Sequence, residues 1–308
     1  MVDRIIADRF TIERLVGAGG MGEVFRAKDR LTGGLVAVKV LYGSLVREAE
    51  RFKREAQILA DLTHPRIVKY VAHGVIEGGR PYLAMEWLEG EDLADRIERS
   101  GLTLHETLTV ARRIAEALAA LHDKGIIHRD IKPSNVFLPN KSVDLAKVLD
   151  FGVARLMGAA LPSTRSGIMV GTPGYMAPEQ ARGARELDAR ADVFALGCLV
   201  YECIAGRPAF AAENVAALLA KILLESPPSL REIGIEVPPA LDDLLSRMLS
   251  KHPASRPGSG GAVLKELEAF AAVRDSPAQR ASLPAMRALT AGERRLVCVV
   301  MAAFPHVE

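Results

Sequence analysis

The feature that most constrains this chain is a polar stretch set between short apolar runs, from His128 to Gly152. Asp130 and Asn135 lie just before one strand-like run, and Asp150 follows the next. Catalytic groups are common on tight connections of this kind, because the neighbouring strands hold them in place. The pattern predicts a polar site fixed by two adjacent strands.

The composition bounds the kind of protein that can carry such a site. The chain has 308 residues, 49% hydrophobic and 25% charged, which is typical of a soluble globular protein with two lobes or domains. A net charge of +2 without a sustained Lys/Arg stripe argues against a nucleic-acid partner. No uncharged run approaches about 18 residues, so no membrane span is expected. The three cysteines lack C-x-x-C spacing and no leader segment is evident, which favours a reducing, cytoplasmic location.

A glycine-rich turn at 17–24 lies in a segment that predicts β-hairpins. The runs 24–28 and 36–40 are strand-like and face each other across the Gly33-Gly34 turn. A dinucleotide-binding fold uses similar glycine spacing but needs a helix next, so two strands favour a flap over phosphates. A plain hairpin turn is the alternative for this loop taken alone.

Lys39 lies on the predicted strand 36–40, on the same face as Ala37. Apolar residues recur at helical spacing from Leu45 to Leu62, and Glu55 falls on their stripe. A buried carboxylate needs a partner, so we expect Lys39 to pair with Glu55 and to extend toward a ligand phosphate. The alternatives are that the Lys39 side chain extends to water, or that Glu48 rather than Glu55 is its partner.

After the strand-like run 82–85 the pattern becomes mainly helical up to about residue 272. One helix is predicted from Leu104 to Lys124, with Gly125 as its stop. A small mixed lobe should therefore precede a larger helical lobe, with a ligand site in the cleft between them.

The polar stretch fits the needs of phosphoryl transfer. If a nucleoside triphosphate lies under the glycine loop, transfer needs a divalent metal and a carboxylate that orients the attacking hydroxyl. Asn135 and Asp150 offer the oxygen ligands that Mg²⁺ takes. Asp130 remains to accept the hydroxyl proton, and Lys132 can steady the transferred charge. Taken singly, these residues could be turn residues, and His128 a core histidine; together and in this order they indicate phosphoryl transfer.

Several motifs occur in an order that resembles a known family. They are the glycine loop 17–24, Val36-Ala37-Val38-Lys39, His128-Arg129-Asp130, Asn135, Asp150-Phe151-Gly152 and Ala177-Pro178-Glu179. From residue 10 to 272 the chain resembles the eukaryotic-type protein kinase superfamily, and most of all its bacterial Ser/Thr protein kinase branch. The resemblance implies an α+β, bilobal protein-kinase fold with a β-rich N-lobe at 10–88 and a helical C-lobe at 89–272.

The resemblance also implies a set of functional residues. It implies ATP and Mg²⁺ as cofactors, with Mn²⁺ as an alternative, Asp130 and Lys132 as catalytic residues, and Asn135 and Asp150 as metal ligands. The residues implied to bind ATP are Val16, Gly17, Ala18, Gly19, Gly20, Gly22, Val24, Ala37, Lys39, Glu55, Met85, Glu86 and Leu88. The residues implied to support the site are His128, Arg129, Phe151, Thr172, Glu179, Asp192 and Arg256. Among these, Asp192 resembles the brace of the catalytic-loop backbone, and Arg256 the partner of Glu179.

The implied function is transfer of the γ-phosphoryl group of ATP to serine or threonine hydroxyls of proteins. Lys132 and the segment 171–173 resemble the serine/threonine branch rather than the tyrosine branch. Ile131 and Phe194 replace the residues commonest in the family, but both are apolar exchanges. A pseudokinase would lack the lysine, the base or a metal ligand, and none is missing. A small-molecule kinase is disfavoured by the extended loop before Glu179.

The small and polar residues 161–167 predict a loop that carries phosphorylation sites. We expect autophosphorylation of Thr164 and Ser166, with Arg129 as the cation that pairs with phosphate, and self-association for reaction in trans. At the ends of the chain, residues 1–9 are expected to form an N-terminal extension and 273–293 a linker. Residues 294–308 are strand-like and predict the start of a further domain, in a larger multidomain signalling protein, or a docking strand.

Overall fold

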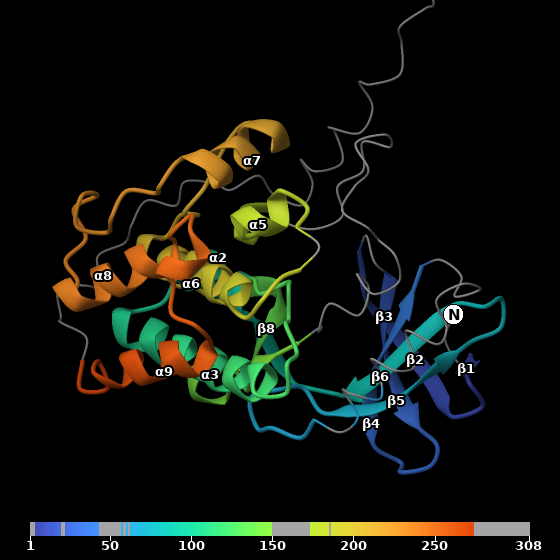
Figure 1. Ribbon diagram of the computed structural model, residues 1–308. Coiled ribbons are helices and arrows are strands. Elements are labelled where there is room, and N and C mark those ends of the chain that lie inside the picture. The colour runs from blue at the N-terminus through green and yellow to red at the C-terminus, as the bar shows by residue number, and fades with distance from the viewer. Residues whose placement is uncertain are drawn as a thin grey trace, which may run out of the picture.

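The structure is a computed structural model that describes residues 4–19, 22–42, 57, 60, 62–149, 173–184 and 186–273. Within these ranges a β-rich part precedes a larger, mainly helical part (Figure 1). The expected division into a small N-lobe and a larger C-lobe is therefore confirmed. In the part of the chain that is described, no helix is long and apolar enough to cross a membrane.

An antiparallel sheet of six strands forms the N-lobe, in the order β1-β2-β3-β4-β6-β5. The strands are β1 (Ile5–Ile6), β2 (Phe10–Gly19), β3 (Gly22–Asp29), β4 (Leu35–Leu41), β5 (Tyr70–Val75) and β6 (Pro81–Glu86). The predicted hairpin across Gly33-Gly34 is present as β3 and β4, and Gly33 takes a φ of 73° that favours glycine. β1 lies in the segment expected to be an extension, where it adds an edge strand to β2.

The two faces of this sheet differ in burial. Side chains alternate along each strand, so Phe25 of β3 and Val38 of β4 point to one side and are buried in the N-lobe core. Val24, Ala37 and Lys39 point to the other side and are only half-buried. The second face is thus the one on which the predicted nucleotide-binding residues gather.

The C-lobe is built around two central helices that carry most of its large buried side chains. Its helices are α2 (Leu93–Ser100), α3 (Leu104–His122), α5 (Pro178–Ala181), α6 (Arg190–Ala205), α7 (Val215–Leu224), α8 (Pro239–Met248) and α9 (Gly260–Glu268). The 3₁₀ turns are η1 (Pro133–Asn135), η2 (Val143–Leu145), η3 (Pro173–Tyr175) and η4 (Pro253–Ser255). Leu118 and Leu121 of α3 and Phe194 and Leu196 of α6 are fully buried in one apolar cluster.

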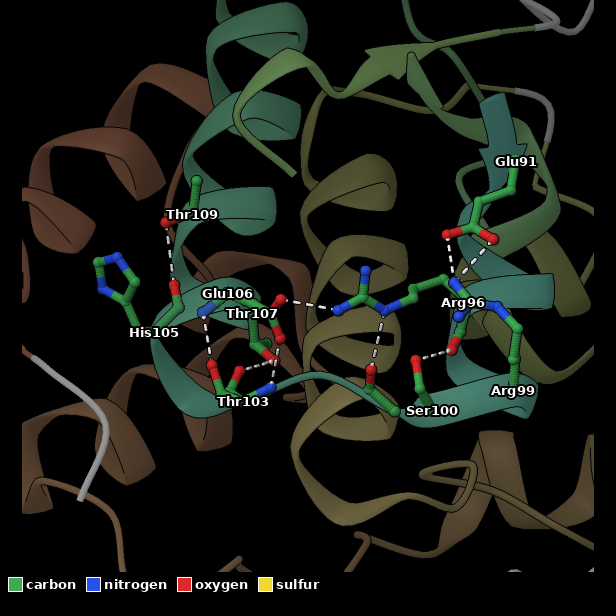
Figure 2. A network of polar contacts seen from close by, with 10 residues as sticks. Glu91, Arg96, Arg99, Ser100, Thr103, His105, Glu106, Thr107 and Thr109 are labelled. Carbon is green, nitrogen blue, oxygen red and sulfur yellow. Dashed lines mark hydrogen bonds and ion pairs between the residues drawn. The ribbon is translucent and has the colours of Figure 1, made fainter. Parts of the chain in front are cut away.

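The start of α3 is fixed by a polar network (Figure 2). Thr103 and Glu106 form a capping box: Glu106 N donates to Thr103 Oγ1 at 3.2 Å, and Thr103 N donates to Glu106 Oε2 at 2.9 Å. Arg96 of α2 donates to the other oxygen of Glu106 at 2.7 Å and to Gly101 O at 3.2 Å. These contacts hold α3 against α2, and the end of α3 leads into the polar stretch.

The far end of α3 leads into that stretch. The helix ends at His122, slightly before the predicted Lys124, and Gly125 turns the chain with a φ of 71°. A small sheet follows, in the order β7 (Gly90–Asp92), β8 (Val136–Pro139) and β9 (Lys147–Val148). The runs 136–138 and 148–149, predicted as strands, correspond to β8 and β9. Val148 also forms a bridge with Ile67, which joins this sheet to the chain just before β5.

Candidate active site

Asp130, Lys132 and Asn135 lie together in the connection between α3 and β8. Lys132 Nζ donates to Asp130 Oδ2 at 2.8 Å, and Asn135 Nδ2 donates to the same oxygen at 2.9 Å. Asn135 Nδ2 also donates to Asp130 O at 2.8 Å, because the η1 turn begins at Pro133 and brings Asn135 back over Asp130. Both donors thus contact Asp130 Oδ2, and neither contacts Oδ1. Since Nδ2 of Asn135 faces Asp130, its amide oxygen Oδ1 is directed away from that carboxylate.

The Asp192 side chain holds the backbone of the connection between α3 and β8 in place. Its side chain is 0% exposed, and its two oxygens accept the N–H groups of His128 and Arg129, each at 2.7 Å. Arg129 has a φ of 67°, a left-handed conformation that costs about 1 kcal/mol for a non-glycine residue. The charge-assisted hydrogen bonds that the carboxylate of Asp192 accepts offset that cost and fix the peptide just before Asp130.

His122 completes the surroundings of Asp192 and was missed by the sequence reasoning. Gly260 N donates to His122 Nδ1 at 3.0 Å, so the other ring nitrogen carries the hydrogen and donates to Asp192 Oδ2 at 3.0 Å. A neutral ring in one tautomer therefore joins the end of α3, the start of α6 and the start of α9. No motif or helical spacing in the sequence indicates this role of His122.

His128 is a buried histidine with both ring nitrogens engaged. Asp130 N donates to its Nδ1 at 3.3 Å, so Nε2 carries the hydrogen and donates to Leu149 O at 2.9 Å. The ring thus ties the Asp130 connection to the end of β9, next to the position of Asp150. The alternative reading as a satisfied core histidine and the supporting role both agree with this geometry.

Residues of α5 reach the same connection. Gln180, another residue absent from the predictions, donates from Nε2 to Arg129 O at 3.2 Å and accepts from Ala177 N at 3.0 Å. Its neighbour Glu179 accepts from both terminal nitrogens of Arg256, at 2.7 and 2.9 Å. The Arg256 side chain is 0% exposed and also donates to backbone oxygens of Arg190 and Ser250.

On the N-lobe side the predicted residues form rows across the half-buried sheet face. Val24 pairs with Gly17 on one side and with Lys39 on the other, and Ala37 pairs with Met85. The remaining predicted residues lie on β2, at its junction with β3 and at 86–88, the segment called the hinge from here on. They are Val16, Ala18, Gly19, Gly22, Glu86 and Leu88. Val16 is an apolar side chain that is 45% exposed.

Glycine is required for different reasons at different positions of the β2–β3 turn. A Cβ on Gly22 would lie 2.2 Å from Val40 O, and its φ is 157°, so the fold itself needs glycine there. A Cβ on Gly17 or Gly19 would meet no described atom within 4 Å, and neither has a positive φ. The described part of the chain does not require glycine at these two positions, whereas close approach by a ligand would.

Some predicted residues lie outside the described part of the chain: Gly20, Glu55, Asp150, Phe151, Thr164, Ser166 and Thr172. The expected Lys39–Glu55 pair, the second metal ligand and the phosphorylation sites therefore stay predictions. The described residues contain no group of three or more His, Cys, Asp or Glu side chains that could hold a metal ion. A site built from the amide oxygen of Asn135 and from Asp150 falls outside that description.

The hinge after β6 is anchored on its C-lobe side. Glu86 Oε1 accepts from Lys69 N at 2.8 Å and from Lys147 Nζ of β9. This contact links the hinge to the strand that leads to Asp150, and Lys147 was not among the predicted residues. A lysine directly before an apolar pair, as in Lys147-Val148-Leu149, gives no signal of a partner in another lobe.

Several pKa shifts among the described residues belong to groups away from this site. Hydrogen bonds from Arg9 hold the pKa of the buried Asp29 well below its usual range. Burial raises the pKa of Glu202, which accepts from Tyr175, and burial lowers the pKa of Lys251 to about 8. Lys251 Nζ donates to Ile222 O at 2.7 Å and lies 4.1 Å from the Phe210 ring centroid. These groups belong to the packing of the two lobes.

Comparison with known proteins agrees with this geometry. The family described as Protein kinase domain matches residues 10–267. The chain therefore belongs to the protein kinase domain family, and the predicted membership of the eukaryotic-type superfamily, in its bacterial branch, is confirmed.

Relatives and solved structures extend the comparison. Serine/threonine-protein kinase pkn3 of Myxococcus xanthus is 38% identical over 281 residues, which are 87% of this chain and 51% of that protein. PknA of Mycobacterium tuberculosis is 36% identical, covering 93% of this chain and 67% of that protein. The chain thus spans about half of pkn3.

Two crystal structures share the fold. The PknI kinase domain of Mycobacterium tuberculosis has a TM-score of 0.67 at 28% identity, covering 87% of this chain and 98% of that one. Rad53 in complex with AMP-PNP has a TM-score of 0.70 at 27% identity, covering 84% of this chain and 64% of that one. The expected protein-kinase fold is therefore confirmed.

Proposed function

We propose that this protein is a serine/threonine protein kinase that transfers the γ-phosphoryl group of ATP to serine or threonine hydroxyls of proteins. The observation that carries the proposal is the contact of Lys132 and Asn135 with one oxygen of Asp130, which leaves the other oxygen to a hydroxyl. The serine/threonine names of relatives such as pkn3 support the choice of acceptor.

The roles of the catalytic residues follow from this arrangement. Asp130 orients the attacking hydroxyl and accepts its proton through Oδ1. Lys132 lies beside it with its side chain 14% exposed, so its charge is available to the transferred phosphoryl group. Arg129, Asp192 and His128 act by holding the Asp130 backbone, and the Glu179–Arg256 pair holds the helix that carries Gln180.

The proposed metal ligands are Asn135, through Oδ1, and Asp150. Mg²⁺ bound there, or Mn²⁺ in its place, would neutralise phosphate oxygens of the nucleotide. An amide and a carboxylate oxygen fit the preference of these ions for hard oxygen donors.

The proposed nucleotide site is the half-buried face of the N-lobe sheet. Gly17, Gly19 and Gly20 leave room for phosphates beneath the β2–β3 turn, with Val16 and Val24 as apolar walls. Lys39, paired with Glu55, would reach the phosphates, and Met85 to Leu88 would line the adenine side. Rad53, which shares the fold, was crystallised with AMP-PNP, and that supports ATP as the nucleotide.

Regulation by phosphorylation belongs to the same proposal. Phosphate on Thr164 or Ser166 would pair with Arg129 and order the segment that ends at Thr172. Autophosphorylation in trans requires self-association. Activity and phosphate content of a Thr164→Ala/Ser166→Ala variant test this idea, which fails if both equal those of wild type.

The chain's place in a longer protein is the remaining part of the proposal. We take 10–272 as the kinase domain, 273–293 as a linker and 294–308 as the start of a further domain or a docking strand. The partial coverage of relatives such as pkn3 supports this view. Light scattering on the chain with and without 290–308 separates a docking strand, whose loss changes the mass of the assembly, from an inert end.

The function is tested with radiolabelled ATP, Mg²⁺ and a generic protein substrate. Wild type should transfer label to serine and threonine, and Asp150→Asn should transfer almost none. Undiminished label in the variant, or none with wild type, would overturn the proposal.

A further inference from the structure

The hinge carries Trp87, the one tryptophan of the 308-residue chain, and its ring lies against two arginines. The ring centroid is 5.4 Å from Cζ of Arg26 on β3 and 5.8 Å from Cζ of Arg14 on β2. The indole Nε1 donates to Glu89 Oε1 at 2.6 Å. The face of the Trp87 ring therefore contacts arginines of the N-lobe sheet, while its N–H edge is bonded to Glu89, just after the hinge.

Arg14 and Arg26 need such a partner because they face each other directly in the β2–β3 ladder. Like charges directly opposite each other on neighbouring strands are destabilising. Glu13 lies 2.9 Å from Arg26 Nε and forms an ion pair with it. The electron-rich face of the indole attracts both guanidinium groups and offsets the remaining repulsion.

The pair of Arg14 and Arg26 lies in an irregular part of the β2–β3 ladder. The β2–β3 register shifts between Ile12 and Arg14 and again between Leu15 and Gly17, so the Arg14 segment lies between two irregularities. Irregular pairing fixes a strand less firmly than a continuous ladder. The next regular pair toward the turn is Gly17 with Val24, at the root of the glycine-rich hairpin.

The pair also shares a row with residues of the proposed nucleotide site. Arg26 lies opposite Ala37, and Ala37 lies opposite Met85, so these side chains share the half-buried face. Lys39 lies one row further from the hinge, opposite Val24. The row that Trp87 contacts is thus on the proposed adenine side of the sheet.

We propose that Trp87, with Arg14 and Arg26, is a positioning clamp that holds the glycine-rich hairpin over the nucleotide. The clamp sets the affinity for the nucleotide and leaves the rate of phosphoryl transfer unchanged. The proposal rests on the proposed function as an ATP-dependent kinase.

Steady-state kinetics with ATP and direct titration with AMP-PNP test the clamp. Trp87→Ala should raise the KM for ATP and the Kd for AMP-PNP by roughly twofold to fivefold, the range of exposed cation–π contacts, with kcat nearly unchanged. Trp87→Phe keeps a ring face and should recover most of the affinity. Arg30→Gln is the matched control, because Arg30 lies just beyond the opposite end of β3 and its side chain donates to the exposed Asp8 O at 3.2 Å.

Fluorescence of the single tryptophan gives a second readout. Arg26→Gln and Arg14→Gln should make Trp87 more accessible to acrylamide, and AMP-PNP should protect it in wild type. These two variants also carry the affinity test if Trp87→Ala does not fold. An unchanged Kd in all folded clamp variants, or a loss confined to kcat, would overturn the clamp. Wild type that neither binds AMP-PNP nor transfers phosphate would instead overturn the proposed function.

Discussion

The connection that carries Asp130 and the N-lobe face that carries Lys39 are held in opposite ways. Buried polar groups bind the backbone of the first, with Asp192 accepting two N–H groups and Gln180 donating to a carbonyl. The second is held by strand pairing and by side chains that stay half-exposed. The difference indicates that Asp130, the proposed acceptor for the proton, is held in place before any ligand binds, whereas the proposed nucleotide side can adjust.

The largest expected effect comes from breaking the buried ion pair on the C-lobe side. Arg256→Met strands Glu179 and should lower the free energy of unfolding by about 3–5 kcal/mol, measured by urea denaturation. Arg247→Met is the control, because its pair with Glu266 is exposed and should contribute about 1 kcal/mol or less. Equal losses in the two variants would contradict the account.

The next effect concerns Asp192, which holds the backbone just before Asp130. Asp192→Asn keeps the shape of the side chain but replaces one accepting oxygen by an NH₂ group, so one buried N–H of the connection loses its acceptor. A shift of the catalytic group of this kind costs roughly 100-fold in kcat. The KM for ATP should change little, since the N-lobe face is untouched. A variant with a raised KM and a normal kcat would mean that the two regions are not held independently.

A smaller effect separates two adjacent glycines at the start of α9. A Cβ on Gly260 would lie 2.5 Å from Leu118 Cβ and 2.7 Å from Ala119 N, so Gly260→Ala should cost about 1–3 kcal/mol and disturb His122. The nearest atoms to a Cβ on Gly261 are 3.6 and 3.7 Å away, so Gly261→Ala should be neutral. Thermal denaturation of both variants checks the difference, and similar melting temperatures would refute it.

The smallest effect on stability is expected on the N-lobe face. Gly17→Ala meets no described atom and should change the free energy of unfolding by less than about 0.5 kcal/mol. It should nevertheless weaken AMP-PNP binding, because the methyl group occupies room meant for phosphates. Calorimetric titration and denaturation of the same sample test both halves, and lost stability with normal binding would assign this glycine to the fold.

The sequence predicted the parts of this comparison that depend on local pattern. The hairpin of β3 and β4, the strands around Asp130 and the approximate end of α3 follow from alternation, helical period and turn residues. The family motifs then named Asp192 and Arg256, whose contacts are now visible. Local pattern and motif order were sufficient for these elements.

Contacts between segments far apart in the chain could not be predicted from the sequence. The three-way contact of His122 with Asp192 and Gly260 joins three helices, and no spacing reveals it. The opposition of Arg14 and Arg26 depends on register shifts within β2, so simple alternation along the strands cannot fix which residues pair. Trp87 lies between Glu86 and Leu88, which were predicted to bind ATP, but no sequence feature indicates that its ring lies over both arginines.

The most direct test of the central claim is the single-turnover rate of phosphoryl transfer in Asp130→Asn, with its Kd for AMP-PNP measured in parallel. The account predicts a rate about 10²- to 10⁴-fold below wild type at saturating ATP and an unchanged Kd, because Asp130 serves the hydroxyl and not the nucleotide. An undiminished rate, or a loss of affinity that accounts for the whole effect, would contradict it.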